Sequence, residues 1–128
     1  MAWTFSGREA VYIQIADIIR QDIFKGKYPL GSQLPTVRQL AAEAAVNPNT
    51  MQRALLSLED EGLLYSKGTV GRFVTDDEAV LLEAKERMIK ASVRQLLDGA
   101  LSLGISPQAL AEYIMKEQKE ERDECSDN

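Results

Sequence analysis

The chain has 128 residues, of which 15 are lysine or arginine and 20 are aspartate or glutamate, and its formal net charge is −5. This length predicts one compact domain with a small appendage, and a hydrophobic share of 45% argues against wholesale disorder. Histidine is absent and the single cysteine, Cys125, lies in a polar tail, which excludes histidine-based catalysis, internal disulfides and thiolate metal clusters. We therefore expect neither an enzyme nor a bound cofactor.

The first two predicted helices are separated by a loop. The first spans residues 8–25, where apolar side chains recur at steps of three and four, at Tyr12, Ile15, Ile19 and Ile23. Gly26 ends this helix, and the segment KYPLGSQLP, with two prolines and a glycine, is typical of a loop. A shorter helix is predicted over residues 36–45.

The third predicted helix has the clearest start in the chain. Asn47 is a favourable N-cap, and Pro48 suits the first helical position, where its missing N–H costs nothing. The core-facing positions of this helix are Met51, Leu55 and Leu58. It ends at Gly62, and the segment LLYSKGTVGRFVT predicts two short strands around a glycine-containing turn, with Leu64 and Phe73 facing inward.

The C-terminal part is predicted to be helical over residues 77–103, to break at Gly104, and to resume in a helix that Ser106 caps and Pro107 opens. Near-heptad spacing defines an apolar stripe formed by Leu82, Ile89, Val93, Leu96, Ala100, Leu103, Leu110 and Ile114. So broad an apolar face is not stable in water alone. We expect part of it to pack on the N-terminal region and the rest on a second copy of the chain, as a homodimer.

The acidity belongs to the C-terminal part of the chain. Residues 1–75 carry eight basic and seven acidic side chains, whereas residues 76–128 carry seven basic and thirteen acidic ones. The opening residues MAWTFSGREA lack the basic start and apolar run of a secretory signal, and no stretch approaches the roughly 18 apolar residues of a membrane span. These patterns predict a cytoplasmic protein without a membrane partner.

The order helix, loop, helix, tight turn, capped helix, hairpin is that of a winged helix-turn-helix. Polar side chains occupy the start of the third helix, at Asn47, Asn49, Thr50, Gln52 and Arg53. Asparagine and glutamine can read adenine, while arginine reads guanine or holds phosphate. By themselves these residues fit a solvated helix face equally well. Their place between a tight turn and a hairpin favours a helix that enters the DNA major groove.

Four motifs support this interpretation: Tyr-x-Gln-Ile, Gly-x-Tyr-x-x-Gly, Leu-Pro-x-x-Arg-x-Leu-Ala and Leu-Glu-x-Glu-Gly-Leu. The segment from Val11 to Val74 that carries them resembles the DNA-binding domain of the GntR family of bacterial transcription regulators. The VNPNT turn is similar to the YtrA-type subfamily in particular, whose members carry a short C-terminal appendage of two helices. The resemblance implies a winged helix-turn-helix domain over residues 1–75 and a helical dimerisation region with an acidic tail over residues 76–128.

The resemblance also implies roles for individual residues. Arg38 matches an arginine of the second helix that contacts operator DNA, and Thr36 occupies a capping position beside the phosphates. The recognition-helix contacts are matched by Asn49, Thr50 and Gln52, and the minor-groove or phosphate contacts of the wing by Lys67, Gly68 and Thr69. Relatives often have arginine in place of Pro48 and Gln52, so a different base preference is expected here. The glycine spacing of the wing also departs from the common pattern.

The expected fold is mainly α with a small β-hairpin, and the expected function is a homodimeric repressor that binds a palindromic operator in double-stranded DNA. The alternative is a protein–protein adaptor that uses the winged scaffold without specific DNA binding. An enzyme of the aminotransferase-like type would need a large cofactor domain, for which the chain has no room. Whether a small-molecule effector binds the C-terminal helices is left open, because the histidines and the large ligand domain of other relatives are absent.

Overall fold

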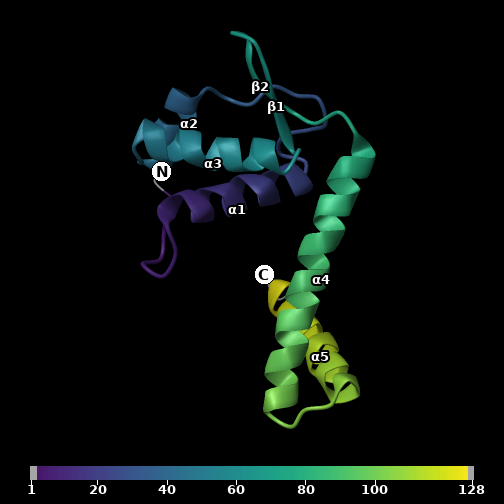
Figure 1. Ribbon diagram of the computed structural model, residues 1–128. Coiled ribbons are helices and arrows are strands. Elements are labelled where there is room, and N and C mark those ends of the chain that lie inside the picture. Colours follow the sequence, from purple (N-terminus) through teal and green to yellow (C-terminus); the bar gives the residue numbers. More distant parts are fainter. Residues whose placement is uncertain (1–2, 127–128) are drawn as a thin grey trace. The chain divides into compact units, whose positions relative to one another are not determined.

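The computed structural model describes residues 3–126, with side chains for residues 3–123, and this part of the chain contains five α-helices and one two-stranded antiparallel sheet. Figure 1 labels α1 (Val11–Phe24), α2 (Val37–Ala44), α3 (Pro48–Asp60), β1 (Leu64–Lys67), β2 (Gly71–Val74), α4 (Glu78–Ser102) and α5 (Pro107–Ser126). The chain forms two compact units, which divide within α4 between Lys85 and Glu86. The expected fold class, a winged helix-turn-helix followed by two helices, is confirmed.

Helix α1 begins later than residue 8, the start that the sequence predicts. Its N-cap is Ala10, and the residues before it form a loop that Gln14 holds in place. The amide of Gln14 accepts the N–H of Ser6 at 2.8 Å and donates to the carbonyls of Ser6 and Glu9 at 2.9 Å. The Glu9 carbonyl therefore accepts a hydrogen bond from a side chain. The backbone N–H of Ile13 bonds to the carbonyl of Ala10 instead. This explains the position of glutamine in the Tyr-x-Gln-Ile motif.

The two helices of the helix-turn-helix are capped by their own side chains. Thr36 Oγ1 accepts the N–H of Gln39 at 3.1 Å, and the Gln39 side chain accepts the N–H of Thr36 at 2.8 Å, which forms a capping box. Ala45 ends α2 in the left-handed region with φ 58°. Asn47 then caps α3 by accepting the N–H of Asn49 at 2.7 Å, so the predicted cap is confirmed and the turn between the helices is short.

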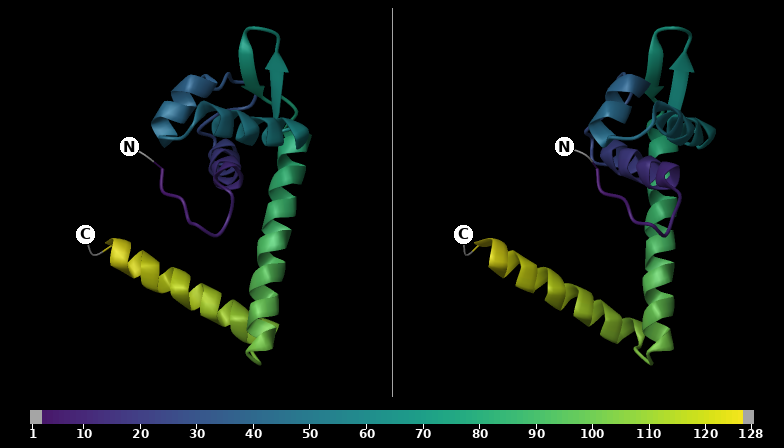
Figure 2. Two further views of the ribbon diagram at one scale, coloured as in Figure 1. Left: turned by 60° about the vertical axis from the view of Figure 1, so that its left-hand side comes forward. Right: turned by 90° about the vertical axis from the view of Figure 1, so that its left-hand side faces the viewer.

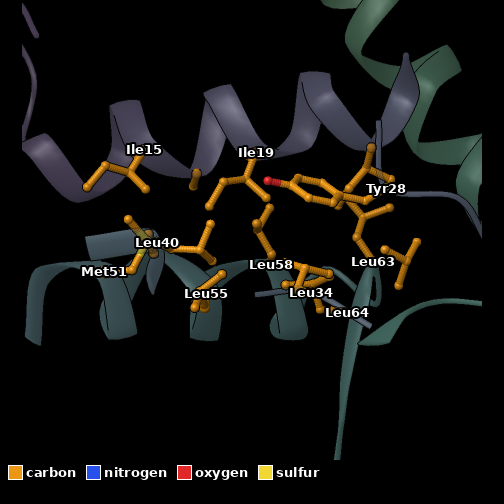
Figure 3. Packing of buried hydrophobic residues seen from close by; sticks show 14 of the residues in the cluster. Ile15, Ile19, Tyr28, Leu34, Leu40, Met51, Leu55, Leu58, Leu63 and Leu64 are labelled. Carbon is orange, nitrogen blue, oxygen red and sulfur yellow. The ribbon is translucent and has the colours of Figure 1, made fainter. Parts of the chain in front are cut away.

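The core of the first unit lies between α1 and α3, as Figure 3 shows. Ile15 and Ile19 of α1 are fully buried against the inner face of α3. That face consists of Met51, Ala54, Leu55 and Leu58, with the three larger residues at the predicted positions. The first turns of α4 belong to the same unit, where Ala84 joins the core cluster and Leu81 packs against it. Part of the long helix thus packs on the N-terminal region, as expected.

The register of the hairpin decides which of its side chains are buried. Leu64 pairs with Val74, and residues directly opposite each other share a face, so both are buried. The prediction that Phe73 faces inward is wrong, because Phe73 pairs with Tyr65 on the other face. Phe73 is half-buried there, and its ring stacks on Tyr65 with the centroids 5.6 Å apart.

In the second unit, α4 and α5 diverge from the turn at Gly104 and form an open V, as Figure 2 shows. Ser106 caps α5 by accepting the N–H of Ala109 at 3.1 Å. Within one chain the apolar stripe is largely exposed: Leu96 is 50% and Leu103 is 81% exposed, whereas Ala100 is 8% exposed. Across the described residues, no helix is long and apolar enough to cross a membrane. The side chain of Cys125 lies outside the described part of the chain.

The division of α3 into a buried and an exposed face predicts unequal costs of truncation. Leu58 is 0% exposed and Leu56 is 44% exposed on the same helix. We expect Leu58→Ala to lower the free energy of unfolding by about 2–5 kcal/mol, because it removes buried methyl groups and leaves a cavity. Leu56→Ala should stay within about 0.5 kcal/mol of the wild type. Urea unfolding of the full chain measures both, and equal costs would contradict the packing of α3.

Candidate nucleic-acid interface

The N-cap and the first two turns of α3 present one polar face, the reading face, formed by Asn47, Asn49, Thr50, Gln52 and Arg53. Asn47, Asn49 and Arg53 are exposed, and Thr50 and Gln52 are half-buried. At 3.6 residues per turn Asn49 and Arg53 lie opposite the buried residues of α3, Thr50 and Gln52 lie at the two sides, and Asn47 is the N-cap that precedes the helix. The structure therefore brings together all five residues that the sequence singles out on this helix, and none of them is in the core.

Arg53 is held at the α1 edge of the reading face. Its guanidinium lies over the ring of Tyr12 of α1, 3.9 Å from the ring centroid, which is the geometry of a cation–π contact. Tyr12 is half-buried and packs against the core cluster. The contact leaves Arg53 exposed but limits the directions in which its side chain can point.

The opposite edge of the reading face is tied to the wing, the hairpin of β1 and β2. Arg72 of β2 donates from Nε to Glu59 Oε1 at 2.7 Å and from Nη1 to Gln52 Oε1 at 3.2 Å. Ser66 of β1 also donates to Glu59. Arg72 thus connects the wing with Gln52 of the reading face. Through the Glu59 carboxylate, which also accepts from Ser66, the same connection includes both strands of the wing.

Sequence reasoning assigns no role to Arg72 or Glu59. Gln52 and Glu59 are seven residues apart on α3, which places them on the same face of the helix, and this spacing was the available signal. Arg72 lies 13 residues beyond Glu59, and only the strand pairing brings it to α3.

The carboxyl of Glu59 is held in its ionised form. Burial acts to raise its pKa, but hydrogen bonds from Ser66 and Arg72 together with the positive charge of Arg72 outweigh this effect, so the pKa of Glu59 lies below its ordinary value. The side chains of Arg72 and Glu59 are 14% and 21% exposed, so this ion pair is shielded from solvent more than a surface pair.

The N-terminus of α2 and the wing enclose a groove of about 350 Å³. Thr36, Gly68 and Thr69 line it, so three of the predicted contact residues from two segments share one depression. Gln33, which also lines the groove, donates to the carbonyl of Val70 at 2.9 Å. Next to it, Gly71 has φ +139°, a backbone conformation that residues with a side chain rarely adopt, and a Cβ atom there would lie 2.8 Å from Gln33 Nε2 and displace the end of that side chain.

The remaining predicted cations are exposed. Arg38 lies on the solvent side of α2 and forms no ion pair with the described residues. Lys67 ends β1, with its ammonium 5.8 Å from the ring centroid of Phe73. In the described part of the chain no three His, Cys, Asp or Glu side chains are grouped so that they could hold a metal ion. The candidate site consists of polar and cationic groups at the start of α3, at the start of α2 and in the wing.

Comparison with known proteins identifies a family with this architecture. Residues 11–74 match the family of bacterial regulatory proteins called gntR. The chain is 33% identical over 105 residues to the HTH-type transcriptional repressor YtrA of Bacillus subtilis (strain 168), covering 81% of each chain. A GntR family transcriptional regulator from Listeria monocytogenes has a TM-score of 0.85 and 28% identity, covering 88% of this chain and 98% of that one.

A solved complex shows how one similar domain is used. The DNA-binding domain of AraR, in complex with operator ORX1, matches with a TM-score of 0.51 and 30% identity, covering 56% of this chain and 93% of that one. The fold, the polar reading face and these similarities define a winged helix-turn-helix DNA-binding protein. The chain belongs to the GntR family of bacterial regulatory proteins, is YtrA-like, and is a transcriptional regulator, which confirms the resemblance in its motifs.

Acid unfolding should report the ionisation of Glu59. Its pKa in the fold lies below the ordinary value of 4.5, so the carboxylate contributes stability above that pH and loses it as the pH falls through the folded-state pKa. Glu59→Gln removes this ionisation. We expect the Tm of the wild type to fall more steeply than that of Glu59→Gln between roughly pH 5 and pH 3.

The matched control for this measurement is the next residue on α3. Asp60 is exposed and forms no ion pair among the described residues. Asp60→Asn should therefore follow the wild-type dependence of Tm on pH. A Glu59→Gln curve parallel to the wild type would show that the contacts of Glu59 with Arg72 and Ser66 do not stabilise the ionised form.

Proposed function

We propose that the chain is a homodimeric transcriptional repressor that binds a palindromic DNA operator. The observation that carries the proposal is the one-sided division of α3, whose buried residues are all apolar and whose exposed start carries the reading face beside the wing. A helix of this kind fits the major groove, with its N-terminal residues toward the base edges. The 33% identical YtrA of Bacillus subtilis is a transcriptional repressor, which supports repression here, and a dimer bound at a promoter would exert it by blocking polymerase.

The proposed DNA contacts fall into two groups. The base edges would be read by the reading face at the start of α3. The phosphates and the minor groove would be contacted by Thr36 and Arg38 of the α2 segment and by the wing tip, Lys67, Gly68 and Thr69. The shared groove between Thr36 and the wing tip supports a common role for these two segments. Since phosphate contacts position a protein and base contacts specify the sequence, the groups should respond differently to mutation.

The homodimer is supported by the apolar stripe. Of its eight members Leu82, Ile89, Val93, Leu96, Leu103 and Ile114 are exposed in the isolated chain, and contiguous apolar surface of this kind marks an interaction site. The V between α4 and α5 also contains an apolar cavity of about 750 Å³, lined by Leu96, Ala100, Leu103 and Leu110 among others. We assign the stripe and this cavity to the second subunit. A two-fold dimer then requires a palindromic operator.

The relatives are transcriptional regulators, and we propose no catalytic activity for this chain. A protein–protein adaptor on the same scaffold differs from a repressor in one measurable respect. A protein that binds DNA displaces counterions from the phosphates. Its affinity for DNA therefore falls steeply as the salt concentration rises. An adaptor shows no such affinity, so a titration of the full chain with selected DNA at several salt concentrations separates the two functions.

Removal of Arg38 should weaken DNA binding at every site. Arg38 is exposed and has no partner in the described fold, so Arg38→Ala should leave the Tm unchanged while weakening the Kd for operator DNA about tenfold or more. The slope of log Kd against log salt should fall by about one. Electrophoretic mobility shift assays on a selected operator measure both quantities.

Lys27→Ala is the matched control for Arg38→Ala. It removes one positive charge from the same unit, where Lys27 is paired with Asp22 and Glu43 and lies outside the proposed contacts. Its Kd should stay close to that of the wild type. An equal loss in both variants would mean that net charge, and not a contact of Arg38, determines the affinity.

A charge on the apolar stripe should separate the subunits. Leu96 is 50% exposed within the stripe, and Leu101 is 51% exposed on another side of α4. We expect Leu96→Glu to sediment as a monomer, because it places a carboxylate in an apolar interface, and Leu101→Glu to remain a dimer. Analytical ultracentrifugation distinguishes these states. A dimeric Leu96→Glu variant would place the interface elsewhere.

A further inference from the structure

We infer that Arg72 is a positioning residue that fixes the direction of the Gln52 side-chain amide and thereby makes Gln52 prefer guanine to adenine. This rests on the proposed function, in which Gln52 faces a base edge. The starting observation is the hydrogen bond of 3.2 Å from Arg72 Nη1 to Gln52 Oε1. Arg72 belongs to the wing but lies outside the proposed DNA contacts, and its inferred role is to set the base specificity of the reading face.

The direction of the Gln52 amide follows from the chemistry of its neighbour. A guanidinium carries only donors, so the amide group that faces Arg72 must be the acceptor Oε1. The Nε2 hydrogens of Gln52 meet no acceptor among the described residues and remain available. Gln52 therefore offers a hydrogen-bond donor to a ligand on the reading face, while its acceptor is turned toward the wing.

Arg72 is itself held in place, which makes the direction of the amide stable. Its Nε donates to Glu59 Oε1 at 2.7 Å, and the arginine side chain is 14% exposed. Ser66 holds the same carboxylate from β1. A rotation of the Gln52 amide by 180° would bring its NH2 group against the guanidinium, donor against donor, which the fixed position of Arg72 disfavours.

A glutamine whose acceptor is already bonded to Arg72 distinguishes the two purines in the major groove. Guanine presents two acceptors there, N7 and O6, whereas adenine presents the acceptor N7 beside the donor N6. Bidentate pairing of glutamine with adenine requires Oε1 to accept from N6, so Oε1 of Gln52 would have to accept from Arg72 and N6 at once in the direction that Arg72 sets. The Nε2 group can donate to guanine without leaving a base donor unpaired, so guanine is preferred.

The free protein provides a test that needs no DNA. The side-chain NH2 signal of Gln52, identified by its loss in Gln52→Ala, is followed by 15N relaxation in the wild type and in Arg72→Met. We expect a restricted amide in the wild type and increased motion on the picosecond to nanosecond scale in Arg72→Met. Equal motion in both would show that Arg72 does not hold the amide, and would overturn the inference.

The second test measures base preference on an operator selected from random DNA. The base pair read by Gln52 is the position at which Gln52→Ala abolishes preference, and the four possible pairs are compared there by Kd. We expect the wild type to bind guanine roughly fivefold or more tightly than adenine. Arg72→Met should shift this ratio toward adenine, because the freed amide can rotate and pair with adenine at both atoms.

Two further variants separate positioning from structural damage. Ser66→Ala removes another hydrogen bond to Glu59 without touching Gln52, and should keep the wild-type ratio. Arg72→Lys keeps a cation beside Glu59 but loses the second nitrogen that reaches Gln52, so it should shift the ratio even if Arg72→Met does not fold. In the Gln52→Ala background, neither Arg72 variant should change the preference.

The possible failures are distinguishable. A wild type without specific, salt-dependent DNA binding would overturn the proposed function and this inference together. Specific binding with a preference for adenine, or with the same ratio in the wild type and the Arg72 variants, would overturn the inference and leave the proposed function intact. A uniform loss of affinity over all four bases in Arg72→Lys would assign Arg72 a purely structural role.

Discussion

The burial of one face of α3 is the constraint on which the rest of the first unit depends. Helices α1 and α2 and strand β1 all pack on α3, so the turn, the wing and the reading face take their positions from it. Because the buried and polar faces belong to one rigid helix, the hydrophobic core sets the direction of the reading residues. A loss of packing at Leu58 would therefore disturb the proposed DNA contacts although Leu58 is not one of them.

Both edges of the reading face are held before any DNA is present. The ring of Tyr12 supports Arg53, and Arg72 holds Gln52 from the wing. A long side chain loses up to about 2 kcal/mol of rotamer entropy when it is fixed, so restraint in the free protein lowers the entropy lost on association. The same restraint reduces the choice of partners, since a side chain that cannot turn presents one hydrogen-bonding pattern.

How much the sequence predicts depends on how local each interaction is. The Asn47 cap, Pro48 and the break at Gly104 act over a few residues, and the elements around them were predicted within a few residues. The predicted start of α1 at residue 8 is wrong because the side chain of Gln14 bonds back to the preceding loop. The predicted inward orientation of Phe73 is wrong because the turn sets the strand register, and the register decides which face of the hairpin is buried. The link between Arg72 and Gln52 needs that register too, so no local pattern indicates it.

The net charge of −5 does not show which charges of the first unit are paired with one another. Arg20 pairs with Asp17 and Glu61, Lys27 pairs with Asp22 and Glu43, and Arg72 pairs with Glu59. These pairs engage five of the seven carboxylates in residues 1–75 and occupy only three of the eight cations there. Arg38, Arg53 and Lys67 keep no carboxylate partner among the described residues, and these are the cations of the proposed DNA contacts. An acidic chain can therefore keep uncompensated cations at its proposed DNA contacts, and attraction to phosphate depends on which charges remain uncompensated near the DNA.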